Sequence, residues 1–194
     1  MIYLVRHGET EFNVARRWQG AQDSPLTPLG VRQAEAMAAR LTGLVAAEPG
    51  GWRLVASPLG RARATAAIIG ERLGLAASFD ERLREHSIGA LDGHAVEEVL
   101  PFLPQGRPRH ERHFHVPGAE SFESMTARIG AFLAEVTPDD RLIAVSHGAA
   151  GRVFRGVYAG LGKAEMLTLK VPQDAIFRLE GGRIQRIDCA PVVS

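Results

Sequence analysis

The chain has 194 residues, 45% hydrophobic and 23% charged, which is enough for one globular domain with a full core. Its net charge of +1 excludes the basic field that draws a protein to nucleic acid. One cysteine (Cys189), no signal-peptide core and no apolar segment of bilayer-spanning length lead us to expect a cytoplasmic protein with no disulfide and no membrane partner.

The chain begins with a strand and a helix separated by an irregular segment. Residues 2–6 are apolar and β-prone, which predicts a buried strand. Residues 9–26 are polar and irregular. Thr27-Pro28 then predicts an N-cap and a first helical position, and the helix is expected to continue to about Val45.

A second strand and helix follow. Residues 53–57 predict another buried strand, and the helix after it is expected from about Leu59 to Leu73, closed by Gly74. A third strand is expected over 76–80. This alternation favours an α/β fold, a three-layer α/β/α sandwich with a mostly parallel central sheet and helices on both faces.

Residues 86–118 have a different composition. They contain four prolines together with glycine, histidine and arginine, and only one short helix is expected, near 96–100. We interpret this segment as a small cap insertion folded over one end of the sheet. Because there is no linker, repeat or low-complexity tract, we expect a single domain over 1–194.

The last part of the chain returns to the α/β pattern. A helix is expected over 121–136 and a strongly apolar strand over 141–145. Another helix is expected from Gly148 to about Tyr158. Segments 174–179 and 183–188, joined by two glycines, predict a hairpin.

Three predicted strands end in polar clusters that precede helices. These clusters contain Arg6 and His7, then Arg61, then His147. Because the carboxyl ends of parallel strands meet at one edge of a sheet, we expect these side chains to converge in one pocket. Two arginines and two histidines suit a dianionic tetrahedral group, and a helix N-terminus at Gly148 adds N–H donors.

Six segments carry a resemblance to a known family. They are Arg-His-Gly-Glu-Thr at 6–10, Asp23 to Gly30, Ser-Pro-Leu-x-Arg-Ala-x-x-Thr-Ala at 57–66, Leu-Arg-Glu at 83–85, Val-Pro-Gly-Ala-Glu-Ser at 116–121 and Ser-His-Gly at 146–148. In composition and order they resemble the histidine phosphatase superfamily, the phosphoglycerate mutase-like proteins. The resemblance covers nearly the whole chain, although Ala119 stands where a second glycine is usual.

The resemblance implies phosphoryl transfer through histidine. His7 would be the nucleophile, which requires one unprotonated ring nitrogen and a backbone partner for the other. Arg6, Arg61 and His147 would hold the phosphoryl oxygens. Glu85 would protonate the leaving oxygen and then activate water. Further substrate contacts are expected from Gly8, Thr10, Asn13, Gln19, Gly20 and Gly148. No metal or cofactor is implied, because the arginines supply the positive charge.

The same residues have simpler structural interpretations. Arg6 and Arg61 could form surface ion pairs, His147 could cap a helix, and Glu85 could be a solvated charge at a strand end. We favour the catalytic interpretation, because these residues occur together in matching motifs.

The cap carries further histidines and arginines. The His-x-x-His-x-His spacing over 110–115 is compatible with a metal site, but a solvated loop is the commoner outcome, so no metal is expected. The cap arginines are expected to pair with a second anionic group on the substrate. They are Arg107, Arg109 and Arg112. His86 and His94 are interpreted as polar loop residues near the pocket.

The favoured function is a metal-independent phosphatase acting on small phosphomonoesters. The alternative is a cofactor-dependent phosphoglycerate mutase, but residues 85–89 read Glu-His-Ser-Ile-Gly where the mutases carry Glu-Arg-x-Tyr-Gly. Residues 83–93 are closer to the phosphatase branch, although Leu91-Asp92 replaces its usual Trp-Glu. An inactive phospho-ligand binding protein is the third possibility, disfavoured because the catalytic set is complete.

The expected partner is a small phosphorylated metabolite, which the sequence does not identify. The sequence does not decide whether the protein forms a homodimer. Many members of the family that it resembles self-associate, but this sequence shows no self-complementary patch.

Overall fold

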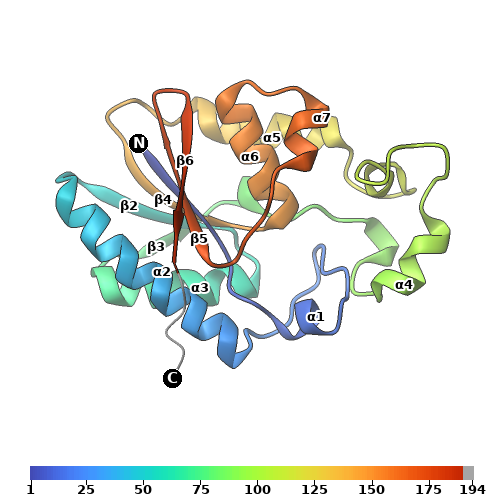
Figure 1. Cartoon of the computed structure of the whole chain (residues 1–194), viewed down its shortest axis with the longest axis horizontal. Helices are drawn as coiled ribbons and strands as arrows, with labels where there is room; N and C mark the ends of the chain where they lie inside the picture. Colours follow the sequence, from blue (N-terminus) through green and yellow to red (C-terminus); the bar gives the residue numbers. More distant parts are fainter. Residues whose placement is uncertain (190–194) are drawn as a thin grey trace.

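A six-stranded sheet forms the centre of the computed structural model, which describes residues 1–189 (Figure 1). The strands are β1 (Ile2–Arg6), β2 (Trp52–Ala56), β3 (Ala77–Phe79), β4 (Arg141–Ser146), β5 (Ala175–Glu180) and β6 (Arg183–Asp188). Their order is β3-β2-β4-β1-β5-β6. Strands β1 to β4 pair in parallel, whereas β5 is antiparallel to both β1 and β6. The predicted α/β class with a mostly parallel sheet is confirmed.

The helices agree with the sequence pattern where it was periodic. They are α1 (Glu11–Val14), α2 (Pro28–Ala47), α3 (Gly60–Leu73), α4 (Val96–Val99), α5 (Phe122–Ala134), α6 (Gly148–Ala159) and α7 (Lys163–Thr168). The side chain of Thr27 caps α2, accepting a hydrogen bond from the Gly30 N–H at 3.0 Å. Helices α1 and α7 were not predicted, since four and six residues are too few to show a helical period. None of the helices in residues 1–189 is long and apolar enough to cross a membrane.

Two apolar cores lie on opposite faces of the sheet, as the alternation of β1 shows. Ile2 and Leu4 pack on the face that α5, α6 and α7 cover. Tyr3 and Val5 pack on the face that α2 and α3 cover. Strand β4 alternates in the same way. Helices therefore cover both faces, and the predicted three-layer arrangement is confirmed (Figure 1).

Residues 86–118, which we call the cap, connect the edge of the sheet to α5 and project to one side of it (Figure 1). The cap contains α4 and short 3₁₀ helices. Its own small apolar cluster comprises Ile88, Val99, Leu103 and Val116, with Trp18 packed against it. This packing attaches the cap to the segment that follows β1, so the cap is held beside the carboxyl end of that strand.

Candidate active site

The ends of β1, β2 and β4 bring the predicted polar clusters together. The N–H of His7 donates to the carbonyl of Ser146 at 3.0 Å, and the N–H of Ser57 donates to the carbonyl of Val145 at 2.9 Å. These bonds continue the parallel ladders into the clusters. As a result the rings of His7 and His147, distant in sequence, lie with their centroids 5.1 Å apart.

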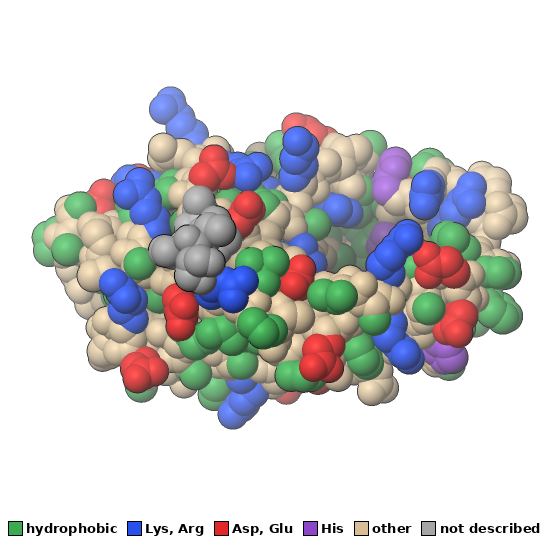
Figure 2. Space-filling model, turned by 60° about the horizontal axis from the view of Figure 1, so that its bottom comes forward, with side chains coloured by type: hydrophobic (Ala, Val, Ile, Leu, Met, Phe, Trp, Pro, Cys, Tyr) green, Lys and Arg blue, Asp and Glu red, His purple; other side chains and the backbone are tan. Residues whose placement is uncertain are grey.

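A cavity of about 180 Å³ opens at this edge of the sheet, and it contains four of the five predicted catalytic side chains. Its lining residues are Arg6, His7, Asn13, Trp18, Gln19, Gly20, Arg61, Glu85, His86, His113 and Ala149. The fifth, His147, is buried against His7. In Figure 2 the surface is hollowed beside the cap, with cationic and histidine side chains at the edge of the hollow.

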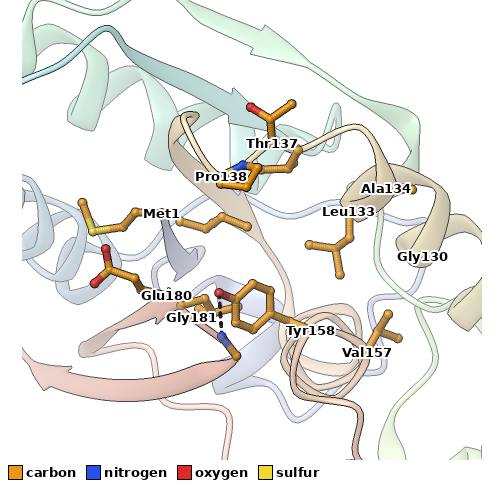
Figure 3. Close-up of a pocket in the computed structure, with 14 residues that line it drawn as sticks. Met1, Gly130, Leu133, Ala134, Thr137, Pro138, Val157, Tyr158, Glu180 and Gly181 are labelled. Atoms are coloured by element: carbon orange, nitrogen blue, oxygen red, sulfur yellow. Dashed lines mark hydrogen bonds between the residues drawn. The ribbon is translucent and has the colours of Figure 1, made fainter.

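A larger cavity, of about 620 Å³, lies at the opposite end of β1 (Figure 3). Met1, Leu133, Val157 and Tyr158 are among its lining residues, and no histidine or arginine lines it. Its polar contacts are few: the hydroxyl of Tyr158 accepts a hydrogen bond from the N–H of Gly182 at 3.4 Å. The convergence of catalytic residue types therefore distinguishes the smaller cavity as the candidate active site.

The imidazole of His7 is held in one tautomer. Its Nδ1 lies 2.8 Å from the carbonyl of Gly8, so Nδ1 carries the proton and Nε2 has a free lone pair. Burial lowers the pKa of His7 well below its usual value, and the charges of Arg6 and Arg61 lower it further. The ring is thus neutral at physiological pH, as a nucleophile requires.

Gly8 lets this segment approach α2 closely. A Cβ at Gly8 would lie 2.2 Å from the carbonyl oxygen of Gly30, so no larger residue fits without moving the backbone. The N–H of Gly8 also donates to the hydroxyl of Thr65 at 3.1 Å. These contacts fix the backbone that orients His7.

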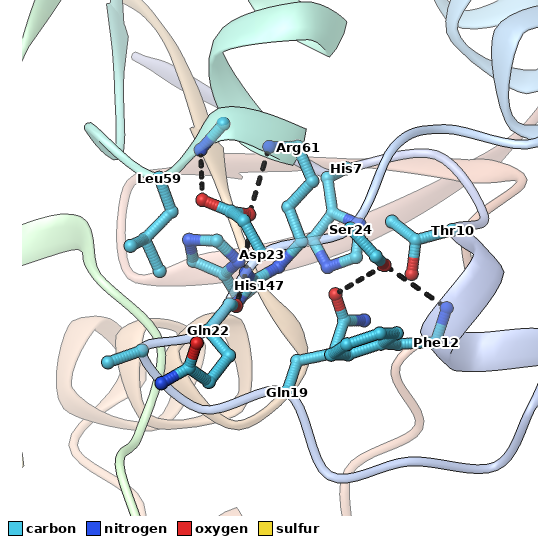
Figure 4. Close-up of polar contacts among 12 residues, drawn as sticks. His7, Thr10, Phe12, Gln19, Gln22, Asp23, Ser24, Leu59, Arg61 and His147 are labelled. Atoms are coloured by element: carbon cyan, nitrogen blue, oxygen red, sulfur yellow. Dashed lines mark hydrogen bonds and ion pairs between the residues drawn. The ribbon is translucent and has the colours of Figure 1, made fainter. Parts of the chain in front are cut away.

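Arg61 is buried at the start of α3 and is held by the segment before α2 (Figure 4). Its Nη1 donates to the carbonyl of Gln22 at 2.7 Å and to Oδ1 of Asp23 at 2.8 Å, and its Nη2 donates to the carbonyl of Gly20 at 2.9 Å. Asp23 also accepts hydrogen bonds from the N–H groups of Gly60 and Arg61. The Nε of Arg61 is buried and has no hydrogen-bond partner among residues 1–189.

Arg6 shows the same combination of anchoring and unused donors. One terminal nitrogen donates to the carbonyl of Val171. Its Nε is buried with no hydrogen-bond partner in the described part of the chain. Burial lowers the pKa of Arg6, while the charge of Glu85 opposes that effect. Buried, unpaired N–H groups on two guanidinium ions are costly, which is expected where an anionic ligand supplies the missing acceptor.

Glu85 caps the N-terminus of α6. Its Oε2 accepts from the N–H groups of Gly148 at 2.9 Å and Ala149 at 3.2 Å, and its Oε1 accepts from Ala150 at 2.9 Å. The helix dipole favours negative charge at this position. The carboxylate of Glu85, the predicted acid, therefore accepts hydrogen bonds from the same kind of N–H groups that would bind a phosphoryl oxygen.

His147 is buried beside His7 and has one unused ring nitrogen. Its Nε2 lies 2.7 Å from the hydroxyl of Ser57, whereas its Nδ1 is buried and has no partner within the part of the chain that the structure describes. Burial lowers the pKa of His147 well below its usual value, and the charge of Arg61 adds to this. The hydroxyl of Ser57 also accepts from the N–H of Leu59 at 3.3 Å and can donate its own proton to Nε2; in that tautomer Nδ1–H is a free donor.

Some of the other predicted contact residues line the cavity, and others lie behind its lining. Asn13, Gln19 and Gly20 line the cavity. Thr10 does not line it: its hydroxyl accepts from the N–H of Asn13 at 3.2 Å and caps α1. The N–H of Gly148 is engaged by Glu85.

The structure does not bring the cap arginines into the cavity. Arg107 and Arg109 are exposed, and Arg112 donates to the side chain of Gln105 and to the backbone carbonyl of Arg107. His94 is also exposed, 3.5 Å from Glu98, whereas His86 lines the cavity. The expected ion pair between these arginines and the substrate is therefore not supported.

The histidines at 110–115 do not gather into one site. Among residues 1–189 no group of three or more His, Cys, Asp or Glu side chains is placed to hold a metal ion. His113 instead lies against His86, with the ring centroids 4.9 Å apart. His115 is exposed, and His110 lies 3.9 Å from Glu111.

Sequence reasoning missed three residues of the site. Trp18 and His113 line the cavity, and Asp23 holds Arg61. Asp23 lies inside a segment that carries the family resemblance, but the sequence gives no sign that Asp23 pairs with Arg61. Trp18 and His113 had no local signal, because their contact depends on how the cap folds back over the sheet.

Comparisons with known proteins show which proteins this chain is similar to. The chain is 34% identical over 193 residues to a protein of Yersinia pestis (strain Pestoides F) named probable phosphoglycerate mutase GpmB, covering 96% of this chain and 84% of that protein. A mycobacterial glucosyl-3-phosphoglycerate phosphatase, solved in complex with VO3, is 28% identical with a TM-score of 0.75, covering 97% of each chain. The alpha-ribazole phosphatase of Shigella flexneri shares the fold, with a TM-score of 0.77 and 20% identity. The match covers 100% of this chain and 98% of that chain.

The family is established by a match along almost the full length. The model of the histidine phosphatase superfamily (branch 1) matches residues 2–186. That range includes every residue that lines the cavity, together with β1 and β4, the strands that precede His7 and His147. The chain belongs to the histidine phosphatase superfamily, branch 1.

Proposed function

We propose that this protein is a phosphatase that hydrolyses small phosphomonoesters through a phosphohistidine on His7. The observation that carries the proposal is the state of that ring: buried, neutral, with Nδ1–H bound to the Gly8 carbonyl and the Nε2 lone pair free. A histidine prepared in this way, inside a pocket that holds two arginines, suits attack on phosphorus.

Arg6, Arg61 and His147 bind the phosphoryl group in this proposal. Each has a buried nitrogen without a hydrogen-bond partner: Nε of Arg6, Nε of Arg61 and Nδ1 of His147. The phosphoryl oxygens accept hydrogen bonds from these nitrogens. Their negative charge balances the positive charges of the two guanidinium groups. Two guanidinium groups stabilise the charge that builds on the equatorial oxygens, so the chemistry needs neither a metal nor a cofactor.

The reaction proceeds in two displacements. Nε2 of His7 attacks phosphorus, the bond from phosphorus to the leaving oxygen breaks, and protonated Glu85 passes its proton to that oxygen. Water then attacks the phosphohistidine, Glu85 takes a proton from the water, and the bond from phosphorus to Nε2 breaks. Inorganic phosphate leaves, and both residues return to their starting protonation states.

Phosphotransfer of the mutase type is the second candidate, because the protein that is 34% identical is named a probable phosphoglycerate mutase. Two features favour hydrolysis. The cap arginines lie outside the cavity, so they do not supply a second anion site for holding a bisphosphate. The related protein solved with VO3 is named a phosphatase.

The test is turnover of p-nitrophenyl phosphate with excess EDTA by the wild-type protein, by His7→Ala and by His94→Ala as a matched control. We expect EDTA-resistant hydrolysis that is lost in His7→Ala and retained in His94→Ala, since His94 is exposed outside the cavity. Activity that survives in His7→Ala would contradict the proposal. Interconversion of phosphoglycerates with a bisphosphate primer, in place of hydrolysis, would establish the mutase instead.

A further inference from the structure

The active-site cavity has two chemically different parts. Arg6, His7 and Arg61 form the part that suits a phosphoryl group. Trp18, His86 and His113 contribute aromatic rings to the rest of the lining, which also includes Asn13, Gln19 and Glu85. The two parts share one cavity of about 180 Å³, so a substrate that places its phosphoryl group on the arginines places its leaving group among these three rings.

The three rings form one packed aromatic cluster. The centroid of His113 lies 5.4 Å from that of Trp18 and 4.9 Å from that of His86. Phe114 supports the cluster from behind, 4.5 Å from His86 and 4.1 Å from His113. Ring centroids at these separations are typical of favourable aromatic pairs. A flat leaving group that enters the cavity meets the aromatic surface of Trp18 and His113.

The two histidines of the cluster are uncharged at physiological pH. Nε2 of His86 lies 2.8 Å from the backbone carbonyl of Glu120, and burial lowers the pKa of this histidine. Burial also lowers the pKa of His113, to about 3, with the charges of neighbouring groups, His86 first, adding to the effect. Neither ring therefore offers a full positive charge to a leaving group.

Within residues 1–189, the cations that line the cavity are Arg6 and Arg61, and neither belongs to the ring cluster. The guanidinium of Arg112 is bonded to Gln105 and the Arg107 carbonyl. Arg152, whose charge acts on His113, donates from Nε to the Leu169 carbonyl and is not among the lining residues. Glu85 also lines the cavity, and its charge acts on Arg6 and Arg152.

From these contacts we infer that Trp18 and His113 select phosphomonoesters whose leaving group is flat and uncharged, such as an aryl group, over those that carry a carboxylate or a second phosphate. The inference rests on the proposed function and names its substrate class. Stacking on the cluster favours the aryl group, and the uncharged rings give a second anionic group no counter-ion. Together these effects amount to about a tenfold or greater preference.

The test measures binding, so that it does not depend on turnover. Dissociation constants of phenylphosphonate and phosphonoacetate, neither of which is hydrolysed as a phosphomonoester, are compared by calorimetry on the wild-type protein. We expect phenylphosphonate to bind at least about tenfold more tightly. Equal binding, or tighter binding of phosphonoacetate, overturns the inference.

Variants then assign the preference to the cluster. His113→Ala is expected to reduce the ratio of the two constants to near unity, and His113→Phe is expected to retain it. Trp18→Leu gives a second, independent loss of the ratio if His113→Ala does not fold. Arg112→Ala, whose side chain faces away from the cavity, is the control and should leave the ratio unchanged. A ratio that stays at the wild-type value in folded His113→Ala and Trp18→Leu contradicts the assignment.

Turnover separates this inference from the proposed function. Values of kcat/KM for phenyl phosphate and 3-phosphoglycerate are measured on the same proteins. Hydrolysis of both substrates without a preference for phenyl phosphate supports the proposed phosphatase activity and contradicts the inference about the leaving group. Preferential binding of phenylphosphonate without hydrolysis of any phosphomonoester supports the inference and removes the phosphatase.

Discussion

The carboxylate of Glu85 occupies the N-terminus of α6, where its Oε2 accepts a hydrogen bond from the N–H of Gly148 at 2.9 Å. Helix N-termini of this kind bind phosphate and carboxylate alike. A phosphoryl group that enters the cavity therefore competes with Glu85 for the same donors. We expect the phosphoryl group to displace Glu85 toward the leaving oxygen, where a proton donor is needed.

Glu85→Gln should separate these two roles. Its amide oxygen can still accept from the N–H groups of Gly148 and Ala149, but its NH2 group replaces Oε1, the acceptor of the Ala150 N–H, so we expect a modest loss of thermal stability. The amide cannot donate a proton as an acid does, so kcat should fall by about 10²–10⁴ on alkyl phosphates. The loss should be much smaller on p-nitrophenyl phosphate, whose leaving group needs little protonation. Equal losses on both substrates would contradict the assignment of Glu85 as proton donor.

Asp23→Asn should weaken catalysis through Arg61. Asp23 is the anionic partner of this buried guanidinium and also accepts from the N–H of Gly60 (Figure 4). Without the carboxylate, Arg61 is less firmly oriented, and we expect kcat/KM to fall by about 10–100-fold, approaching the effect of losing one transition-state donor. Asp188→Asn, which removes an exposed pair with Arg186, is the control. An unaltered kcat/KM in folded Asp23→Asn would show that Arg61 does not depend on this contact.

Gly20→Ala should damage the site by strain. Gly20 has a φ of 51°, and a Cβ there would lie 1.8 Å from a carboxylate oxygen of Asp92. We expect lower thermal stability and lower kcat/KM, because the carbonyl of Gly20 also holds Arg61. Gly43→Ala in α2, where a Cβ meets no atom within 4 Å, should instead raise the free energy of unfolding by about 0.5–1 kcal/mol. Similar responses in the two variants would refute the argument.

Acid should destabilise the protein before its carboxylates titrate. The pKa values of the buried histidines are lowered in the folded state, and these histidines are His7, His86, His113 and His147. As the pH falls below about 6.5, the unfolded chain binds protons that the folded chain does not, so stability is lost. Each such histidine lowers the free energy of unfolding by up to about 1.4 kcal/mol per pH unit until its folded-state pKa is reached.

Urea unfolding between about pH 7.5 and about pH 5.5 measures this slope. For His113 the window of lost stability extends down to about pH 3, its folded-state pKa. His113→Phe removes that titration and should give a shallower dependence on pH. A slope as steep as that of the wild-type protein would show that His113 is not the group responsible.

The convergence of the site could be predicted because it depends on topology. Arg6, His7 and His147 follow directly from apolar strands, and parallel strands of one sheet end at one edge. The two layers of helices could be predicted for the same reason, since their apolar faces repeat along the chain.

The sequence indicates a cap over residues 86–118, but it does not predict which of the cap's side chains face the cavity. Its chain has no apolar period, so nothing local indicates that His113 faces the cavity while Arg112 faces away. The partner of Glu85 was hidden for a different reason. A carboxylate takes the nearest N–H donors when the cavity holds no ligand, and those donors belong to a helix 63 residues further along the chain.

The central claim is that His7 becomes phosphorylated, and the most direct measurement is to quench the reaction with a ³²P-labelled phosphomonoester within the first turnover. We predict label on the protein that is labile in acid and stable in base, as phosphohistidine is, located on the peptide that contains His7. The label should be absent from His7→Ala and present in His94→Ala. Label that persists in His7→Ala, or hydrolysis in the wild-type protein without any labelled intermediate, would contradict the mechanism.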